Sequence, residues 1–111
     1  MSRFPQVDPE TASGKAKELL DGVKSKFGIL PNITRAMANG PAVRDCYLAL
    51  SGALSKGALS PKQREQIALT VGQANGCEYC LAAHSALGKM VGLTSEQILD
   101  SRRGTAVDPK S

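Results

Sequence analysis

Two cysteines in a Cys-x-x-Cys pair, Cys77 and Cys80, are the residues of this chain best suited to carry out chemistry. His84, the only histidine, follows Cys80 by four residues, and Glu65 precedes Cys77 by twelve. On a helix, positions 77, 80 and 84 lie at i, i+3 and i+7, so both sulfurs and the imidazole share one face. Two thiols that can form a disulfide, a base within reach and a carboxylate that can orient the base predict a redox centre.

The two thiols are predicted to be activated in different ways. Gly76 allows a sharp backbone turn, which leaves Cys77 at a helix N-terminus, where unpaired N–H groups and the helix dipole favour a thiolate. Cys80 lies one turn further on, so His84 is better placed to accept the Cys80 proton than the Cys77 proton. Glu65 is expected to return over the site and hold His84 in one tautomer, or take its proton. These two effects leave open which sulfur reacts first.

These residues would support a dithiol–disulfide cycle. One thiolate would attack an oxygen of a hydroperoxide and become a sulfenic acid, and the other thiol would condense with it to a disulfide. An external dithiol would then restore both thiols. The same residues would also support plain thiol–disulfide exchange.

Other interpretations of the same residues stay open. Cysteine, histidine and glutamate are all zinc ligands, although zinc-binding Cys-x-x-Cys pairs usually turn through a loop, whereas these cysteines are predicted to be helical. A purely structural disulfide within one turn closes too small a loop to stabilise the fold much. His84, taken by itself, could be an ordinary helix histidine. Cys46 has no such neighbours along the chain and is predicted to be a core residue.

Gly and Pro divide the chain into helical segments, and no useful length of it alternates with a period of two, so an all-α fold is predicted. Asp8 is expected to be the N-cap of a first helix, with Pro9 at its first position. The segments Ser60–Gln63 and Thr94–Gln97 are capping boxes that predict two further helix starts. The expected helices run from 9 to 27, from 32 to about 39, from 41 to about 57, from 61 to 74, from 77 to about 92, and from 95 to 103.

The helix that carries Glu65 and the helix that begins at Cys77 are joined by Asn75–Gly76, and so tight a connection predicts that the two pack antiparallel. The helix from residue 41 is expected to have an apolar side, which consists of Val43, Cys46, Tyr47, Leu50 and Leu54.

Composition narrows the class of protein. A chain of 111 residues with 4% aromatic residues predicts one domain, residues 1–111, with a small aliphatic core that oligomerisation would supplement. The net charge of +4 is spread along the chain, which argues against nucleic-acid binding. There is no bilayer-length apolar run and no signal peptide, which argues against a membrane protein, and an odd number of cysteines favours a cytoplasmic protein.

Asp108–Pro109 resembles another helix start, so we expect a chain truncated at its C-terminus.

Glu65, the run Cys77–Glu78–Tyr79–Cys80 and His84 resemble the signature of the alkylhydroperoxidase D-like (AhpD-like), carboxymuconolactone decarboxylase superfamily. That signature is a Glu, eleven residues, Cys-x-x-Cys, three residues and a His, and every member is present at this spacing. The segment Phe27–Asn32 resembles the Phe-Gly-x-x-Pro-Asn segment of its peroxidase-related branch. Gly104–Lys110 resembles the linker that precedes further helices in that branch.

The resemblance implies an AhpD-like bundle of about six helices, with the Cys-x-x-Cys pair at the start of a helix, usually assembled as a trimer or hexamer. It implies that Cys80 attacks the peroxide, that Cys77 is its resolving partner, and that His84 and Glu65 form a proton relay. It further implies an antioxidant thiol peroxidase of the peroxiredoxin or alkylhydroperoxidase type. Such an enzyme uses no haem, flavin or metal, and draws electrons from a lipoyl-type or similar dithiol.

The chain departs from this pattern at Tyr79, where well-characterised peroxidases of the superfamily often have a His. The decarboxylase branch generally lacks the cysteine pair, so lactone decarboxylation fits poorly. The predicted function is therefore a cytoplasmic, cofactor-free thiol peroxidase that reduces hydroperoxides. The alternatives are a protein disulfide reductase or redox sensor, and a non-enzymatic zinc-binding or scaffold module.

Overall fold

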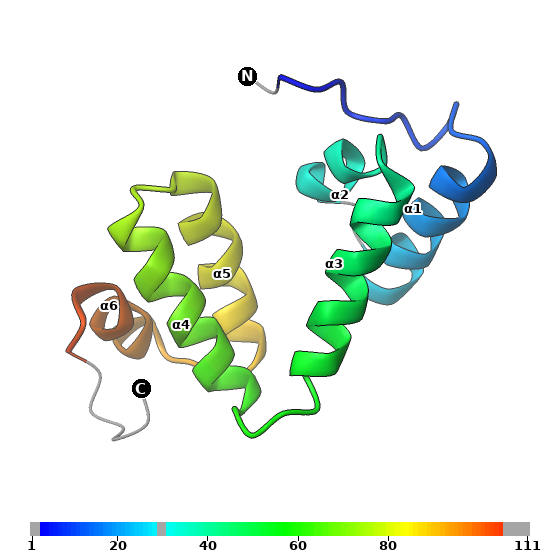
Figure 1. Ribbon diagram of the computed structural model, residues 1–111. Coiled ribbons are helices and arrows are strands. Elements are labelled where there is room, and N and C mark those ends of the chain that lie inside the picture. Colours follow the sequence, from blue (N-terminus) through cyan, green and yellow to red (C-terminus); the bar gives the residue numbers. More distant parts are fainter. Residues whose placement is uncertain (1–2, 29–30, 106–111) are drawn as a thin grey trace. The chain divides into compact units, whose positions relative to one another are not determined.

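The computed structural model describes residues 3–28 and 31–105 (Figure 1). Within these residues the regular secondary structure is entirely helical, which confirms the prediction of an all-α fold with about six helices. The helices are α1 (Gly14–Phe27), α2 (Asn32–Met37), α3 (Pro41–Leu54), α4 (Pro61–Ala74), α5 (Glu78–Met90) and α6 (Ser95–Arg103). The expected helix start at Asp108–Pro109 lies outside the described residues.

The chain divides into two compact units, Met1–Ala53 and Leu54–Ser111. The first unit contains α1, α2 and nearly all of α3, and the second contains α4, α5 and α6. All four residues of the predicted redox site belong to the second unit. The expectation of a single domain over residues 1–111 stays a prediction.

The first unit is held together by a few contacts between its segments. Leu20 and Val23 of α1 are buried, and so is Ala38 directly after α2. The chain before α1 is attached to α2, because the Val7 N–H donates to the Arg35 carbonyl at 3.1 Å and Arg35 Nε donates to the Val7 carbonyl at 2.9 Å.

Helix α1 begins at Gly14, so the expected start at Pro9 is wrong. Asp8 does act as a cap, but of a separate turn: its Oδ1 accepts from the Glu10 N–H at 2.9 Å, and its carbonyl accepts from the Ala12 N–H at 2.9 Å. An Asp side chain can satisfy the donors of a turn as readily as those of a helix. Gly14 then has φ of +60°, a left-handed conformation that favours glycine and separates the turn from the helix.

The expected apolar side of α3 is exposed within this chain. The exposed fraction is 63% for Val43 and 61% for Leu50, and Cys46 is exposed as well, so the interpretation of Cys46 as a core residue is wrong. Arg44 is instead the only buried residue of α3, a helix that the structure describes throughout. Its Nη2 donates to the Leu19 carbonyl of α1 at 2.6 Å, so the inward face of α3 carries a charged side chain.

Both predicted capping boxes of the second unit are confirmed. At the start of α4, Ser60 Oγ accepts from the Gln63 N–H at 3.1 Å, and Gln63 Oε1 accepts from the Ser60 N–H at 2.9 Å. Thr94 and Gln97 make the same two bonds at the start of α6. These reciprocal bonds satisfy donors that a helix leaves unpaired at its first turn, which explains why both helices begin where the sequence predicts.

The core of the second unit lies where α4, α5 and α6 meet. Leu69 of α4, Ile98 of α6 and Leu93 between α5 and α6 are buried together, and Leu81 of α5 packs against them. Thr70 Oγ1 donates to the Ser101 carbonyl at 2.8 Å and so joins α4 to α6. This core fixes α5 against α4, which is the helix pair that carries the predicted redox residues.

None of the helices in the described part of the chain has both the length and the apolar character that crossing a bilayer requires.

Candidate active site

Helices α4 and α5 supply the four residues that the sequence singles out. Glu65 lies in the second turn of α4, and Cys80 and His84 lie on α5. Cys77 is the N-cap residue of α5, so the Cys-x-x-Cys pair stands at the start of a helix as predicted. The fold therefore gathers all four residues on one pair of adjacent helices.

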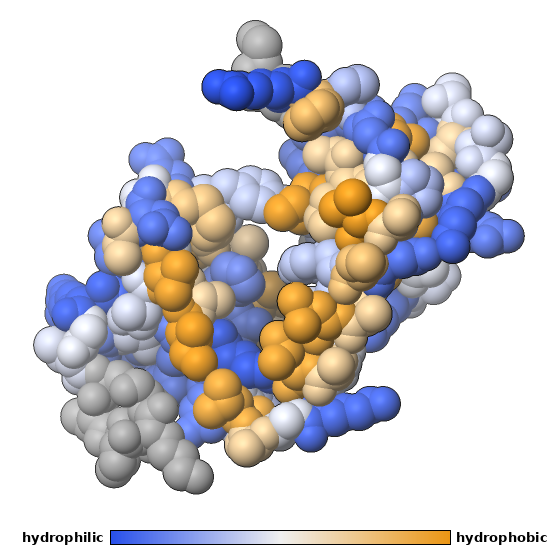
Figure 2. All heavy atoms as spheres, in the orientation of Figure 1, coloured by the Kyte–Doolittle hydropathy of each residue, from blue (hydrophilic) through white to orange (hydrophobic). Residues whose placement is uncertain are grey.

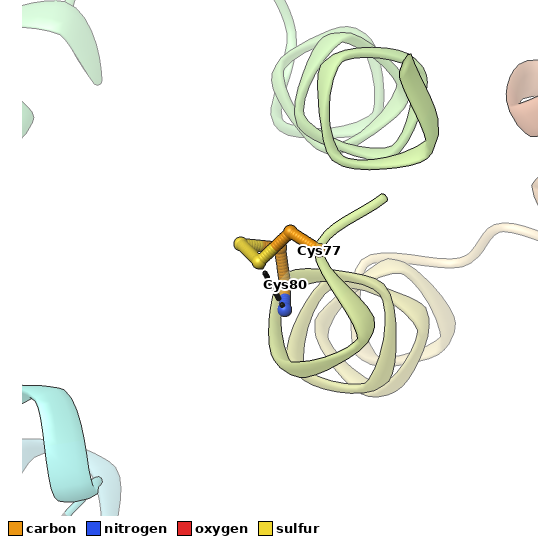
Figure 3. Close-up of a disulfide and its surroundings, with 2 residues drawn as sticks. All are labelled: Cys77 and Cys80. Carbon is orange, nitrogen blue, oxygen red and sulfur yellow. Dashed lines mark hydrogen bonds between the residues drawn. A yellow bond between two sulfur atoms is a disulfide. The ribbon is translucent and has the colours of Figure 1, made fainter. Parts of the chain in front are cut away.

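Cys77 and Cys80 are joined by a disulfide (Figure 3). The Sγ atom of Cys77 also accepts a hydrogen bond from the backbone N–H of Cys80, with an N–S distance of 3.2 Å. This N–H belongs to the first turn of α5, where helix donors have no partner within the helix. Cys77 Sγ thus occupies the position of a capping side chain, a place where a thiolate would be stabilised.

His84 and Glu65 form a close pair across the two helices. The distance from His84 Nδ1 to Glu65 Oε2 is 2.7 Å, and the side chains are 33% and 18% exposed. An ionised carboxylate can only accept a hydrogen bond, so it favours the tautomer of neutral His84 in which Nδ1 carries the proton. Nε2 is then left as an acceptor, which is the form that a general base needs.

The disulfide and the His84–Glu65 pair lie about one helical turn apart along α5, because Cys80 precedes His84 by four residues. None of the hydrogen bonds among the described residues joins His84 to either sulfur. A disulfide has no proton to exchange, so this form of the site requires no such bond.

Gly72 is a residue of the site that sequence reasoning missed. Its carbonyl accepts from the Cys77 N–H at 3.0 Å, and its Cα faces Cys80. One signal could have revealed it: a glycine inside a predicted helix is unfavourable, and this one precedes Cys77 by five residues.

The arrangement of ligand-type side chains bears on the zinc hypothesis. Within the described residues, no group of three or more His, Cys, Asp and Glu side chains is placed so that it could hold a metal ion. The geometry adds no support to a zinc-binding module.

Comparison with known proteins assigns the chain to a family. Residues 41–110 match the model of the carboxymuconolactone decarboxylase family, and the match covers more than half of the chain. The chain therefore belongs to the carboxymuconolactone decarboxylase family, as the sequence motif predicts.

Two known proteins are also similar to the chain. The chain is similar to "Uncharacterized protein 4 in cox locus" from Paracoccus denitrificans, with 32% identity over 63 residues that cover 56% of this chain and 57% of the relative. It is also similar to the crystal structure of an uncharacterized peroxidase-related protein from Ralstonia eutropha JMP134, described as an alkylhydroperoxidase AhpD core.

That structural match has a TM-score of 0.80 and 25% sequence identity, and it covers 97% of this chain and 59% of the other. The prediction of an AhpD-like fold is thereby confirmed. The chain spans less than two thirds of the length of either relative.

Proposed function

We propose that this protein is a thiol peroxidase of the alkylhydroperoxidase type, which reduces hydroperoxides through a dithiol–disulfide cycle of Cys77 and Cys80. One observation carries the proposal: the Cys77–Cys80 disulfide and the close His84–Glu65 pair occur together on the adjacent helices α4 and α5. Membership of the carboxymuconolactone decarboxylase family and the likeness to a peroxidase-related protein support it.

The cycle begins with the reduced pair. Nε2 of His84 accepts the proton of the Cys80 thiol, while Glu65 holds Nδ1 and stabilises the imidazolium. The Cys80 thiolate attacks one oxygen of the hydroperoxide and the O–O bond breaks, which leaves a Cys80 sulfenic acid. The departing alkoxide takes a proton from His84 and leaves as the alcohol. The relay is thus back in its starting form after each attack.

The second half of the cycle closes and reopens the disulfide. Cys77 Sγ attacks the sulfenic sulfur of Cys80 and water leaves, which gives the disulfide. Its position at the N-terminus of α5 favours the thiolate form that this attack needs. A dithiol substrate of the lipoyl type then supplies two electrons and two protons and is itself oxidised to a disulfide. No haem, flavin or metal takes part in any of these steps.

Tyr79 makes this relay simpler than in relatives that have a His at that position. Tyr79 is 49% exposed, and a phenol exchanges protons at neutral pH less readily than an imidazole does. Proton transfer to and from Cys80 would therefore depend on His84 and Glu65.

Self-association of the chain is part of the proposal, because apolar side chains are exposed on both units (Figure 2). They include Leu50 and Leu54 on α3 and Ile67 and Val71 on α4, which are 48–61% exposed. Water-exposed aliphatic side chains in such number favour burial against another protein surface. We propose a homo-oligomer, a trimer or hexamer, in the reducing cytoplasm.

The first test is intact-mass analysis after one equivalent of an organic hydroperoxide is added to the reduced protein. The unsubstituted protein should rapidly lose two hydrogens as the Cys77–Cys80 disulfide forms, whereas a Cys80→Ser variant should form no intramolecular disulfide and react only slowly at Cys77. A Cys46→Ser background removes the remaining thiol as a source of signal. Oxidation no faster than that of a free thiol such as glutathione would rule out peroxidase function.

A further inference from the structure

We propose that Gly72 is the positioning residue of the redox site: its carbonyl anchors Cys77, and its lack of a side chain lets Cys80 lie against the backbone of α4. Only the effect of Gly72 on catalysis rests on the proposed function. Its structural part concerns only the Cys77–Cys80 pair and can be tested without a hydroperoxide.

The first half of this role is a backbone hydrogen bond. The Cys77 N–H donates to the Gly72 carbonyl at 3.0 Å, across the turn between α4 and α5. Gly76 has φ of +63°, a left-handed conformation that lets the chain reverse so tightly. The bond attaches the first sulfur-bearing residue to the last turn of α4, so the start of α5 cannot move away from α4 without breaking it.

The second half of this role is the space that Gly72, which has no side chain, leaves beside Cys80. A Cβ atom placed on Gly72 would lie 3.3 Å from Cys80 Cβ and 3.6 Å from Leu81 Cδ2. Carbon atoms in favourable contact are about 3.5–4.0 Å apart, so any other residue here would press on Cys80. The atom under pressure is Cys80 Cβ, which is bonded directly to the backbone and cannot rotate away as the end of a long side chain can.

Gly72 also lies in register with the proton relay. It follows Glu65 by seven residues, two turns of α4, so both are on the face that meets α5. On the facing helix, Cys80 precedes His84 by one turn. The spacing between the helices is therefore set at one end by the Glu65–His84 contact of 2.7 Å and at the other by Gly72. A larger residue at position 72 would push the Cys80 end of α5 away from α4 and tilt α5 about the Glu65–His84 contact.

The structure offers a matched control. Gly88 of α5 is also a buried glycine inside a helix, and a Cβ there would lie 3.2 Å from Leu93 Cδ1 and 3.6 Å from Ile98 Cδ1. The crowding is similar in extent, but it falls on the flexible ends of two core side chains and is eight residues from Cys80. A Gly88→Ala variant therefore reports the general effect of overpacking this unit.

The experiment measures the equilibrium of the Cys77–Cys80 pair with dithiothreitol in the unsubstituted protein, Gly72→Ala and Gly88→Ala. The disulfide holds Cys80 close to the anchored Cys77, so the added methyl group of Gly72→Ala should penalise the disulfide more than the dithiol. Overpacking has a typical cost in free energy. When only the disulfide form bears that cost, this equilibrium shifts toward the dithiol by about fivefold or more. Gly88→Ala should shift this equilibrium less than twofold, even if its thermal stability falls as much as that of Gly72→Ala.

A shift below fivefold in Gly72→Ala, or an equal shift in Gly88→Ala, would overturn the proposal. If Gly72→Ala does not fold, amide hydrogen exchange in the unsubstituted reduced protein decides the question. The Cys77 amide should exchange more slowly than that of Glu78, a first-turn donor that its own helix leaves unsatisfied. Equal exchange rates would mean that the disulfide alone holds Cys77 in place. Neither measurement uses a hydroperoxide, so a failure of the peroxidase proposal can be recognised separately.

Discussion

Glu65 Oε2 lies 2.7 Å from Nδ1 of His84, although the two residues are nineteen positions apart along the chain. The carboxylate belongs to the second turn of α4, and the imidazole lies midway along α5, so the contact exists only because the two helices pack antiparallel. It leaves His84 Nε2 as the acceptor on the helix that carries Cys80. The pair thereby joins the acidic residue of the motif to the helix that carries Cys80.

Replacing Glu65 with Gln should slow oxidation of the reduced protein by a hydroperoxide by about 100-fold at neutral pH. The neutral amide stabilises the imidazolium less and no longer selects one tautomer, so His84 becomes a weaker and partly misoriented base. Stopped-flow measurement of disulfide formation would give the rate. Glu96→Gln, an exposed acid of α6, is the control and should leave the rate within about twofold. A Glu65→Gln rate equal to that of the control would remove Glu65 from the relay.

Replacing His84 with Gln should separate peroxidase chemistry from plain disulfide exchange. The rate with an organic hydroperoxide is expected to fall by about 10²–10⁴, because general acid–base catalysis of this step is lost. Oxidation by a small disulfide such as oxidised glutathione should fall much less, since the capping position of Cys77 still favours its thiolate. Parallel rate measurements with the two oxidants test this. A hydroperoxide rate that stays nearly unchanged in His84→Gln would instead support a disulfide reductase or a redox sensor.

Replacing Arg44 with Met should leave the free energy of unfolding unchanged or raise it by about 1 kcal/mol. Burial lowers the pKa of the Arg44 guanidinium, an effect that the charge of Asp45 partly offsets. Its Nε and Nη1 atoms are buried with no hydrogen-bond partner among the described residues. The charge therefore loses its hydration, and few hydrogen bonds replace it. Met keeps the apolar stem of the side chain and removes the charge.

Urea denaturation of Arg44→Met and Arg44→Ala would check this prediction. The Ala variant should lose about 2 kcal/mol, because it also leaves a cavity between α1 and α3. A loss as large in the Met variant would mean that the guanidinium itself stabilises the first unit.

Replacing Leu50 with Glu should shift the protein toward smaller assemblies in analytical ultracentrifugation. Leu50 is 61% exposed within this chain, and a charge placed in a buried interface is costly. Ser51→Glu introduces the same charge at the neighbouring exposed position of α3 and should leave the assembly unchanged. An unaltered sedimentation profile for Leu50→Glu would show that this side of α3 is outside the oligomer interface.

Much of the second unit could be predicted because its signals are local. The capping boxes at Ser60 and Thr94 involve residues three positions apart, so their hydrogen bonds can be read from the sequence, and both form. The first unit shows where local signals fail. Asp8 has the side chain of a helix cap, yet it caps a turn, because the left-handed Gly14 interrupts the path into α1.

By itself, the sequence determined the helical segments of the second unit and the motif of Glu65, Cys77, Cys80 and His84, because helix starts and i, i+3, i+4 spacings depend on neighbours along one chain. Tertiary structure alone decided the distance between Glu65 and His84, the contact of Gly72 with Cys80, and which side of α3 is buried. The physical reason is that these features depend on how helices pack. Side-chain volume and backbone approach set that packing, and they join residues that composition and periodicity treat as unrelated.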